Sequence, residues 1–543
     1  MDLENFAPPR RLLLTSVCRP IGEAQGDGHS VGYELLHGQV TRAQGMFSPR
    51  SYQLHFSLEY IAHNLEIPTV VLQYPTKREL IRELKKGYEY VGVSFLLAVF
   101  HRMKHVVEII RKYSPQSKII LGGYGTVLSD EELAPYGDYI CREEGVGFLR
   151  RLLGEAPIPM PYDHPVIING LKVFSKSIGD NGMIFAGLGC PNGCDFCCTS
   201  HFFKRKHIRL LPTGKDIFNV LKNYREKNPS VKFTVLDEDF LLNKQRAMEY
   251  LECVRASGLD LPMFVFSSVK ALSQYTIDEL LELGISGVWI GYEGRRSNFA
   301  KQQGRPVDEL IRELREHGIH ILASMIVGFD YQTPEIIQEE LDGLMAIEPT
   351  FGQFLIYGPT PGTPFYDRVV GEGRLRKKFM KDKHAYYRRC TGFYGMVQHP
   401  TMTSPQLQAI QKDCFRQDFE RLGPSIIRSI DAWWSGYERL KHSTNARLKA
   451  CAKRYRADIL NAVPAFRPAM WFGPTKVARE KARRLFHDIR KEFGAFPMKQ
   501  RLESWLALPL ALWTGLALKI NWLQHPKLVR TEYRAHSETQ VCA

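Results

Sequence analysis

Short apolar runs alternate with helical patterns through the first 150 residues. Segments typical of buried strands occur at 11–17, 69–73, 90–94 and 118–121. Helical patterns lie between them, at 51–65, 77–86 and 102–113. This alternation predicts an α/β fold with a doubly wound, Rossmann-like parallel sheet, which binds ligands at the carboxyl ends of its strands. We assign residues 1–154 to this first domain.

A proline-rich stretch interrupts the alternation, which then begins again. Residues 155–165 (EAPIPMPYDHP) contain four prolines and no periodic pattern, so we place a linker at 155–168. Six strands are predicted beyond it, with amphipathic helices such as 277–283 and 307–317 in the gaps, and they indicate a second α/β domain over 169–370. The six predicted strands are 183–188, 231–236, 263–267, 288–292, 319–327 and 353–357.

Residues 371–543 change character and are predicted to be mostly helical, with long helical stretches at 405–422 and 425–455. This region holds 33 Lys and Arg against 14 Asp and Glu, a net charge of +19. The first 370 residues hold 40 against 44, so the chain's charge of +15 comes from this last region alone. Such basicity predicts a polyanionic partner, a membrane surface or a nucleic acid.

Residues 504–518 (SWLALPLALWTGLAL) carry no charge and lie between Arg501 and Lys519. The segment is shorter than the roughly 20 apolar residues that a spanning helix needs. Tryptophans beside cationic ends favour a segment in the headgroup layer of an anionic membrane. The alternative is a helical cap that buries the segment against the second domain. Nucleic acid is the third choice, because no known binding module is present.

The composition favours a cytoplasmic protein that uses cysteine for metal or redox chemistry. No basic-then-apolar segment typical of a secretory signal is found at the N-terminus, and 11 cysteines are spread over 543 residues. Such spreading is unlike a disulfide framework. The charged tail adds the hypothesis of a peripheral position on the inner face of the membrane.

Three cysteines lie on one glycine-rich loop after the strand 183–188. Cys190, Cys194 and Cys197 have the spacing C-x3-C-x2-C. Thiolates grouped in this way hold a soft metal centre. A [4Fe-4S] cluster usually takes four cysteines, so a loop that supplies three leaves one iron open to an outside ligand.

A zinc site is the alternative interpretation, but structural zinc takes four protein ligands and no partnering C-x-x-C or H-x3-H lies near. Cys198 is adjacent to Cys197 and is interpreted as a packing thiol. The remaining cysteines are scattered singly, which predicts one cluster. We interpret Cys390 and Cys414 as buried thiols.

The three-cysteine loop resembles that of the radical S-adenosylmethionine (SAM) superfamily, and the chain up to residue 370 resembles its cobalamin-binding branch. The resemblance implies that the six units form a partial (β/α)6 TIM barrel and that SAM chelates the open iron. It implies SAM contacts by residues at or near strand ends. These are Phe196 beside the adenine and cluster, Asp237, Glu238 and Asp239 near the SAM amino group, and Glu293 near the ribose or methionine moiety.

The first domain resembles the cobalamin-binding domain of the same branch. The matching residues are Ser94 at a strand end, the pair Gly122 and Gly123, and the segment 138–145. Residues 27–32 also spell D-x-H-x-x-G, in which the histidine (His29 here) replaces the cofactor's own base on cobalt in other cobalamin proteins. The alternative for His29 is a glycine-rich surface loop, because 18 residues separate Gly32 from the predicted helix at 51–65.

The resemblance implies a cobalamin-dependent enzyme that makes a 5'-deoxyadenosyl radical and methylates an unactivated carbon. It also implies an electron donor such as ferredoxin or flavodoxin. The basic, tryptophan-bearing tail favours a lipid or isoprenoid-like substrate over another small molecule such as a natural product. One alternative is a carbon–carbon coupling or cyclisation enzyme with non-methylating cobalamin. Another is a non-catalytic cobalamin or redox sensor.

Overall fold

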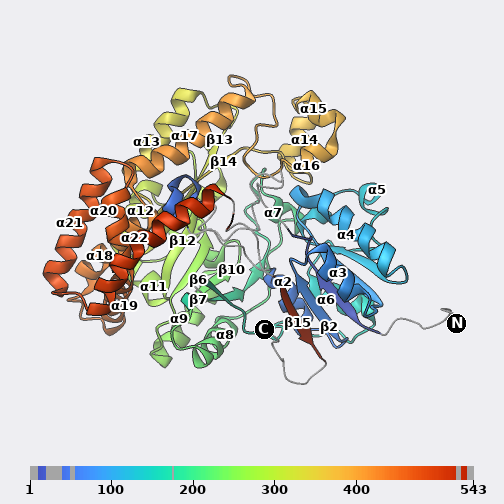
Figure 1. The fold of residues 1–543 in the computed structure, drawn as a ribbon, viewed down its shortest axis with the longest axis horizontal. Helices are drawn as coiled ribbons and strands as arrows, with labels where there is room; N and C mark the ends of the chain where they lie inside the picture. The colour runs from blue at the N-terminus through green and yellow to red at the C-terminus, as the bar shows by residue number, and fades with distance from the viewer. Residues whose placement is uncertain are drawn as a thin grey trace.

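The computed structural model describes residues 10–19, 40–48, 55–173, 176–520, 522 and 528–534. Two sheets with mostly parallel strands form its frame (Figure 1). The first sheet and its blue helices lie at the right of the view, and the green and yellow strands of the second lie at the centre. The red helices of the C-terminal region lie beyond the second sheet, on the side away from the first.

The first sheet has the order β15-β2-β1-β3-β4-β5, and β1 to β5 are parallel. Chain order reverses at β1, because β2 and β3 lie on its two sides, as in a doubly wound sheet. The predicted Rossmann-like fold is confirmed. Its strands are β1 (Leu12–Thr15), β2 (Thr69–Gln73), β3 (Tyr90–Ser94), β4 (Lys118–Gly122) and β5 (Tyr139–Ile140). Its helices are α2 (Phe56–His63), α3 (Lys77–Leu84), α4 (Phe100–Tyr113), α5 (Asp130–Leu133) and α6 (Gly145–Leu153).

The second sheet has the order β14-β13-β12-β11-β10-β7-β6. Six strands are parallel and follow one another in sequence, which confirms the partial barrel, whereas β6 is antiparallel at the edge. The strands are β6 (Ile168–Val173), β7 (Lys176–Phe185), β10 (Lys232–Leu236), β11 (Met263–Ser267), β12 (Ile285–Glu293), β13 (His320–Val327) and β14 (Phe351–Ile356). The helices between them are α8 (Gly214–Lys227), α9 (Lys244–Ser257), α11 (Ile277–Glu282), α12 (Val307–Glu316) and α13 (Pro334–Ala346).

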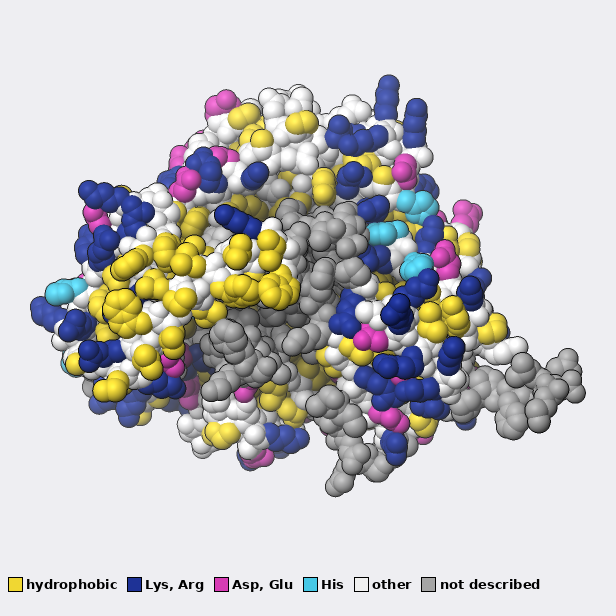
Figure 2. All heavy atoms as spheres, viewed as in Figure 1, with side chains coloured by type: hydrophobic (Ala, Val, Ile, Leu, Met, Phe, Trp, Pro, Cys, Tyr) yellow, Lys and Arg dark blue, Asp and Glu magenta, His cyan; other side chains and the backbone are white. Residues whose placement is uncertain are grey.

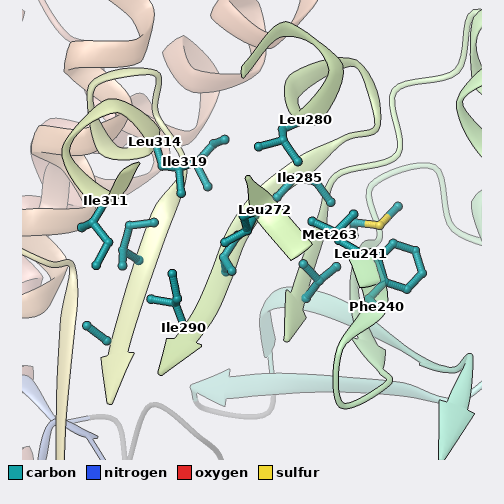
Figure 3. Close-up of a cluster of buried hydrophobic side chains, with 14 of the residues drawn as sticks. Phe240, Leu241, Met263, Leu272, Leu280, Ile285, Ile290, Ile311, Leu314 and Ile319 are labelled. Atoms are coloured by element: carbon teal, nitrogen blue, oxygen red, sulfur yellow. The ribbon is translucent and has the colours of Figure 1, made fainter. Parts of the chain in front are cut away.

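Buried aliphatic side chains fix the barrel strands against their helices (Figure 3). In α12, Leu310, Ile311 and Leu314 are fully buried, because their spacing places them on one face of the helix. Each such side chain contributes roughly 1.5–3 kcal/mol of hydrophobic free energy. The strand ends that carry the polar residues of the cavity described below are therefore held by a rigid core.

Helices follow the barrel, as predicted, but the expected helix at 425–455 is two helices. Asn445 is the N-cap of the second of these helices. Its side chain accepts a 2.9 Å hydrogen bond from the Arg447 amide. The helices are α14 (Pro364–Gly371), α15 (Lys377–Lys381), α16 (Lys383–Tyr387), α17 (Ser404–Leu422), α18 (Ser425–Leu440), α19 (Ala446–Ala462), α20 (Phe466–Phe472), α21 (Lys476–Phe493) and α22 (Met498–Lys519).

Two segments, one from each end of the described chain, pack on a part of the molecule that is distant in sequence. Strand β15 (Val529–Tyr533) pairs antiparallel with β2, and its Arg530 forms an ion pair of 3.0 Å with Glu83. The short helix η2 (Arg42–Phe47) packs against α17 and α22. There the Gln44 side chain donates to the Ser425 hydroxyl at 2.6 Å. The region 371–543 is thus mostly helical, but it also supplies one strand to the first sheet.

Candidate functional site

The cysteine loop, residues 189–197, connects the short strand β8 (Gly187–Leu188) to helix α7 (Cys198–Phe202). Gly189 has a positive φ of 77°, and a Cβ there would lie 2.3 Å from the Lys206 carbonyl oxygen. Only glycine is therefore tolerated at this turn. The Ser200 hydroxyl donates to the Cys190 carbonyl at 2.6 Å and fixes the shape of the loop.

All three predicted ligand cysteines line one cavity at the mouth of the barrel. Burial raises the pKa of Cys190 to about 12 and that of Cys194 to about 11. Only a strongly positive centre removes the protons from such thiols, so the donor set suits a metal cluster. Within the described residues, no three His, Cys, Asp or Glu side chains are gathered around the position of a single ion.

Cys198 lies apart from the other three. It lines a different cavity, together with Cys390 and Tyr357, and burial raises its pKa to about 12. The interpretation of Cys198 as a packing thiol is consistent with this position, which is not on the wall that the other three cysteines share.

The barrel cavity encloses about 610 Å³ and is lined by residues at the carboxyl ends of the barrel strands. It contains every residue that the sequence predicted as a SAM contact. These are Phe196, Asp237, Glu238, Asp239 and Glu293.

The carboxylates of Asp237 and Asp239 both accept hydrogen bonds from other residues of the protein. The Asp237 carboxylate accepts hydrogen bonds from Arg246 at 2.7 Å and shares a contact of 3.1 Å with the His207 ring. Burial alone would raise the pKa of Asp237, but His207 and Arg246 hold it at about 2. Asp239 accepts from Ser267, Ser268 and Asn192 at 2.7–3.2 Å. Because Asn192 belongs to the cysteine loop, Asp239 ties that loop to the barrel.

Glu238 differs from its two neighbours. One oxygen accepts a long hydrogen bond of 3.4 Å from the Tyr124 hydroxyl. The other is buried and has no hydrogen-bond partner among the described residues. Burial, with the charge of Asp237, raises the pKa of Glu238 to about 7. Such an oxygen in a cavity wall is placed to accept a hydrogen bond from a ligand.

Glu293 ends β12 in the left-handed region, with a φ of 58°, where the strand register shifts. Strained backbone of this kind gathers at functional sites. Its carboxylate forms a buried ion pair with Lys301, and a Cβ on Gly291 would lie 2.2 Å from the Glu293 oxygen. Burial is the largest single influence on the pKa of Lys301 and lowers it, but the charge of Glu293, its hydrogen bond with Lys301 and the nearby Cys194 and Cys197 together raise this pKa above its usual value.

Sequence reasoning missed Lys301. Its ammonium lies 5.5 Å from the centre of the Phe196 ring and lines the same cavity as the cysteines. Lys301 belongs to the short helix η6 (Ala300–Gln302), outside any strand end. A single lysine in a connecting segment gives no periodic or motif signal.

The segment after β14 holds the cysteine loop from the opposite side. The Tyr357 hydroxyl donates to the Asp195 carboxylate at 2.7 Å, and the Phe365 amide donates to the Asp195 carbonyl at 3.1 Å. The rings of Tyr357 and Phe365 stack at 3.7 Å. The turn at 359–364, which lies between Tyr357 and Phe365, is therefore anchored directly beside the cysteines.

A second cavity opens at the carboxyl ends of β1, β3 and β4, and it contains Ser94, Gly122 and Gly123. Ser94 lies opposite Gly122 in the register of the sheet. Gly123 has a φ of 86°, and a Cβ there would lie 2.7 Å from the Phe95 carbonyl oxygen. Gly123 must therefore be glycine for the chain to pack on Phe95, whereas a Cβ on Gly122 would meet nothing within 4 Å, so a flat ligand can approach the backbone closely at Gly122. His29 lies outside the described residues.

The two cavities adjoin. Ser57, Tyr124, Phe185 and Leu188 line both of them. Tyr124 comes from the first domain, packs its ring against Phe202 at 5.2 Å and reaches Glu238 in the barrel. Ligands in the two cavities would thus meet at Tyr124.

Residues 184–343 match the model of the Radical SAM superfamily. This segment is therefore a radical SAM domain. The matched radical SAM segment contains the three cysteines, the acidic residues 237–239 and Glu293.

Two curated proteins named for methyl transfer are similar to part of this chain. Bacteriochlorophyllide d C-12(1)-methyltransferase of Chlorobaculum tepidum is 26% identical over 217 residues, 38% of this chain and 45% of that protein. Hopanoid C-2 methylase of Rhodopseudomonas palustris is 24% identical over 205 residues, 36% of this chain and 38% of that protein. The chain spans less than half of the length of each.

A solved structure shares the fold over most of the chain. The radical SAM methyltransferase TsrM of Kitasatospora setae, with cobalamin and a [4Fe-4S] cluster bound, has a TM-score of 0.56. The match covers 83% of this chain and 99% of TsrM at 14% identity. The likeness shows that the overall fold of this chain is a known one.

Proposed function

We propose that this protein is a cobalamin-dependent radical SAM enzyme that methylates an unactivated carbon. The observation that carries the proposal is the junction of two cavities at the carboxyl ends of two sheets, one with three cysteines and one with a glycine cradle. Cys190, Cys194 and Cys197 would hold a [4Fe-4S] cluster, the barrel cavity SAM, and the cavity at Ser94, Gly122 and Gly123 cobalamin.

When bound, the cluster and SAM supply a 5'-deoxyadenosyl radical, and cobalamin supplies a methyl group. The protein positions these groups and excludes water. Glu238 would accept hydrogen bonds from the SAM ammonium, because its second oxygen is buried and available. Lys301 would meet the SAM carboxylate while Glu293 holds the lysine in place. Phe266, Trp289, Ile326 and Leu355 supply apolar wall.

The substrate class we propose is lipid-like or isoprenoid-like. Support comes from the apolar wall of the barrel cavity and from relatives named for hopanoid and bacteriochlorophyllide methylation. An acidic electron carrier such as ferredoxin or flavodoxin would reduce the cluster. The enzyme would act in the cytoplasm, peripherally at the inner face of the membrane.

The test uses anaerobically purified protein, reduced ferredoxin or flavodoxin as the electron donor, SAM with a labelled methyl group and a lipid extract as substrate. We expect release of 5'-deoxyadenosine and transfer of the label to a lipid. 5'-Deoxyadenosine without labelled product would favour the coupling or cyclising alternative, and no 5'-deoxyadenosine would favour a sensor. Comparing lipids of a deletion strain with those of its parent would then identify the substrate.

Cys197→Ala and Cys198→Ala make a matched pair for the cluster assignment. The two cysteines are adjacent, yet only Cys197 lines the barrel cavity. We expect Cys197→Ala to lose most of its iron and acid-labile sulfide and all 5'-deoxyadenosine release, and Cys198→Ala to keep both. Equal iron loss in the two variants would contradict the ligand set.

A further inference from the structure

Helix α22 has its amphipathic character reversed. Most of its large apolar side chains are exposed to solvent, and the residues it buries are Ser504, Ala511 and Ala517. At 3.6 residues per turn the exposed residues fall on one side of the helix, so they form one stripe along it. We call this set the α22 stripe: Leu502, Trp505, Leu506, Leu512, Trp513, Leu516 and Ile520, which are 42–62% exposed.

The protein holds α22 so that this stripe points outward. The helix packs against η2, α20 and the turn at Val463–Ala465. Close approach is possible because the inward residues are small; a Cβ on Gly515 would lie 3.6 Å from the Met46 Cβ. The Arg467 guanidinium lies 3.7 Å from the centre of the Trp505 ring. The alternative that 504–518 is a buried cap does not fit five of its large side chains, which are exposed: Trp505, Leu506, Leu512, Trp513 and Leu516.

Figure 2 shows hydrophobic side chains as a continuous band over α22, with Lys and Arg around it. Beyond the helix, Trp522 is 63% exposed and its ring packs on Trp513 at 5.1 Å. From 476 to 519 the exposed acidic residues are Glu480, Asp488 and Glu492. The exposed basic residues of the same range are Lys476, Arg483, Arg484, Arg490, Lys491, Lys499, Arg501 and Lys519.

We propose that α22 docks this protein on an anionic lipid bilayer, lying flat with its stripe between the headgroups. Exposed leucines bring the hydrophobic energy, tryptophans suit the boundary between acyl chains and headgroups, and the basic rim complements anionic lipid. No helix among the described residues is long and apolar enough to cross a membrane. At about 1.5 Å per residue, α22 has roughly 33 Å to lay along the surface.

The docking proposal goes beyond the proposed chemistry and does not depend on it. A bilayer, rather than a second copy of the chain, is the occupant that the charge distribution favours. Two copies that met through their stripes would bring two basic rims together, whereas anionic lipid neutralises both the rim and the net +19 of residues 371–543.

Flotation of the full-length protein with vesicles tests the proposal. We expect binding to phosphatidylcholine–phosphatidylglycerol vesicles, weaker binding to phosphatidylcholine alone, and weakening by salt. Leu512→Gln with Leu516→Gln should lower partitioning at least about tenfold. The matched control is Val370→Gln with Met380→Gln, which removes exposed apolar side chains from α14 and α15 and should bind as the wild type.

Lipids brominated along the acyl chain give a second readout. They should quench tryptophan fluorescence of the wild type, and less so that of the α22 variant. The proposal is overturned if the wild type does not float with anionic vesicles, or if the α22 variant and the wild type bind equally. It is also overturned if sedimentation shows that the variant only breaks up a dimer. A melting curve unchanged from the wild type confirms that the variant is folded.

Discussion

At the scale of single residues, three neighbouring carboxylates have three different environments. Asp237 faces an arginine and a histidine, Asp239 faces two serines and an asparagine, and Glu238 has one unfilled oxygen. Their order along the chain gives no hint of this division. The side chain that remains available to a ligand is thus decided by partners far away in the sequence.

Glu238→Gln should weaken SAM binding by tenfold or more, because a hydrogen bond to a charged group contributes about 1.5–3 kcal/mol. The affinity is measured by equilibrium binding of SAM to protein with a reconstituted cluster. Glu252→Gln, an exposed substitution on α9, is the control. Iron content should be unchanged in both variants. Undiminished SAM affinity in Glu238→Gln would remove Glu238 from the SAM site.

The raised pKa of Glu238 also predicts a pH effect on stability. Its pKa rises from 4.5 to about 7 on folding, so the folded protein keeps a proton that the unfolded chain releases. The stability that this proton supplies is complete below pH 4.5 and is lost as pH rises through 7. Urea denaturation at pH 5.5 and pH 8 should show Glu238→Gln gaining stability relative to the wild type. The same stability difference between Glu238→Gln and the wild type at both pH values would argue against a raised pKa of Glu238.

The sequence could indicate which strand ends carry chemistry, but not which side chains face a cavity. The resemblance to the radical SAM superfamily implied Phe196, Glu238 and Glu293 as SAM contacts, and all three line the cavity. Lys301 was not predicted, because its approach to Glu293 depends on the path of a connecting segment. Long-range hydrogen bonds of this kind have no counterpart in apolar periodicity.

At the scale of elements, the ion pair between Asp237 and Arg246 joins the end of β10 to helix α9. Both side chains are almost fully enclosed, at 0% and 2% exposure, and the contact is 2.7 Å. Breaking a buried pair leaves a charge without compensation, which typically costs about 3–5 kcal/mol.

Asp237→Asn should therefore lower the free energy of unfolding by about 3 kcal/mol or more. Chemical denaturation measures the change. The control is Glu226→Gln, which removes the exposed pair of Lys222 and Glu226 on α8 and should change stability by less than about 0.5 kcal/mol. Equal changes in the free energy of unfolding of the two variants would mean that the buried pair stabilises the protein no more than the exposed pair does.

Strands in apolar runs were predicted well, and strands in polar segments were not. β6 (INGLKV) and the start of β7 (KSIGDNG) contain glycines and polar residues, so no buried run marks them. β15 (VRTEY) is an edge strand with two charged residues of five, which is typical of edges. Long-range pairing, rather than local preference, makes these segments strands.

At the scale of the whole molecule, β15 covers the open edge of β2. The ion pair of Arg530 with Glu83, and the hydrogen bond of 2.6 Å from the Tyr533 hydroxyl to Glu59, hold it there. The charge of Arg530 and hydrogen bonds to Glu83 overcome the effect of burial and lower the pKa of Glu83 to about 2. Strand β15 therefore pairs with the edge of the sheet and is also held there by side-chain contacts.

Arg530→Ala with Tyr533→Ala should detach β15 and lower the stability of the first domain by about 2 kcal/mol or more. Hydrogen exchange of the β2 amides, measured by mass spectrometry, should quicken. Barrel amides, such as those of β12, serve as the internal control. Unchanged protection of β2 would show that β15 does not stabilise this edge.

The pairing of β15 with β2 sets an order of assembly. A ribosome makes β15 only after the barrel and the helices beyond it, so the first sheet emerges with β2 uncovered. Until then, the row of unpaired backbone groups on β2 can attract other nascent chains. The first domain to be translated is thus the last to be completed, and chaperone demand should fall once residue 533 has left the ribosome.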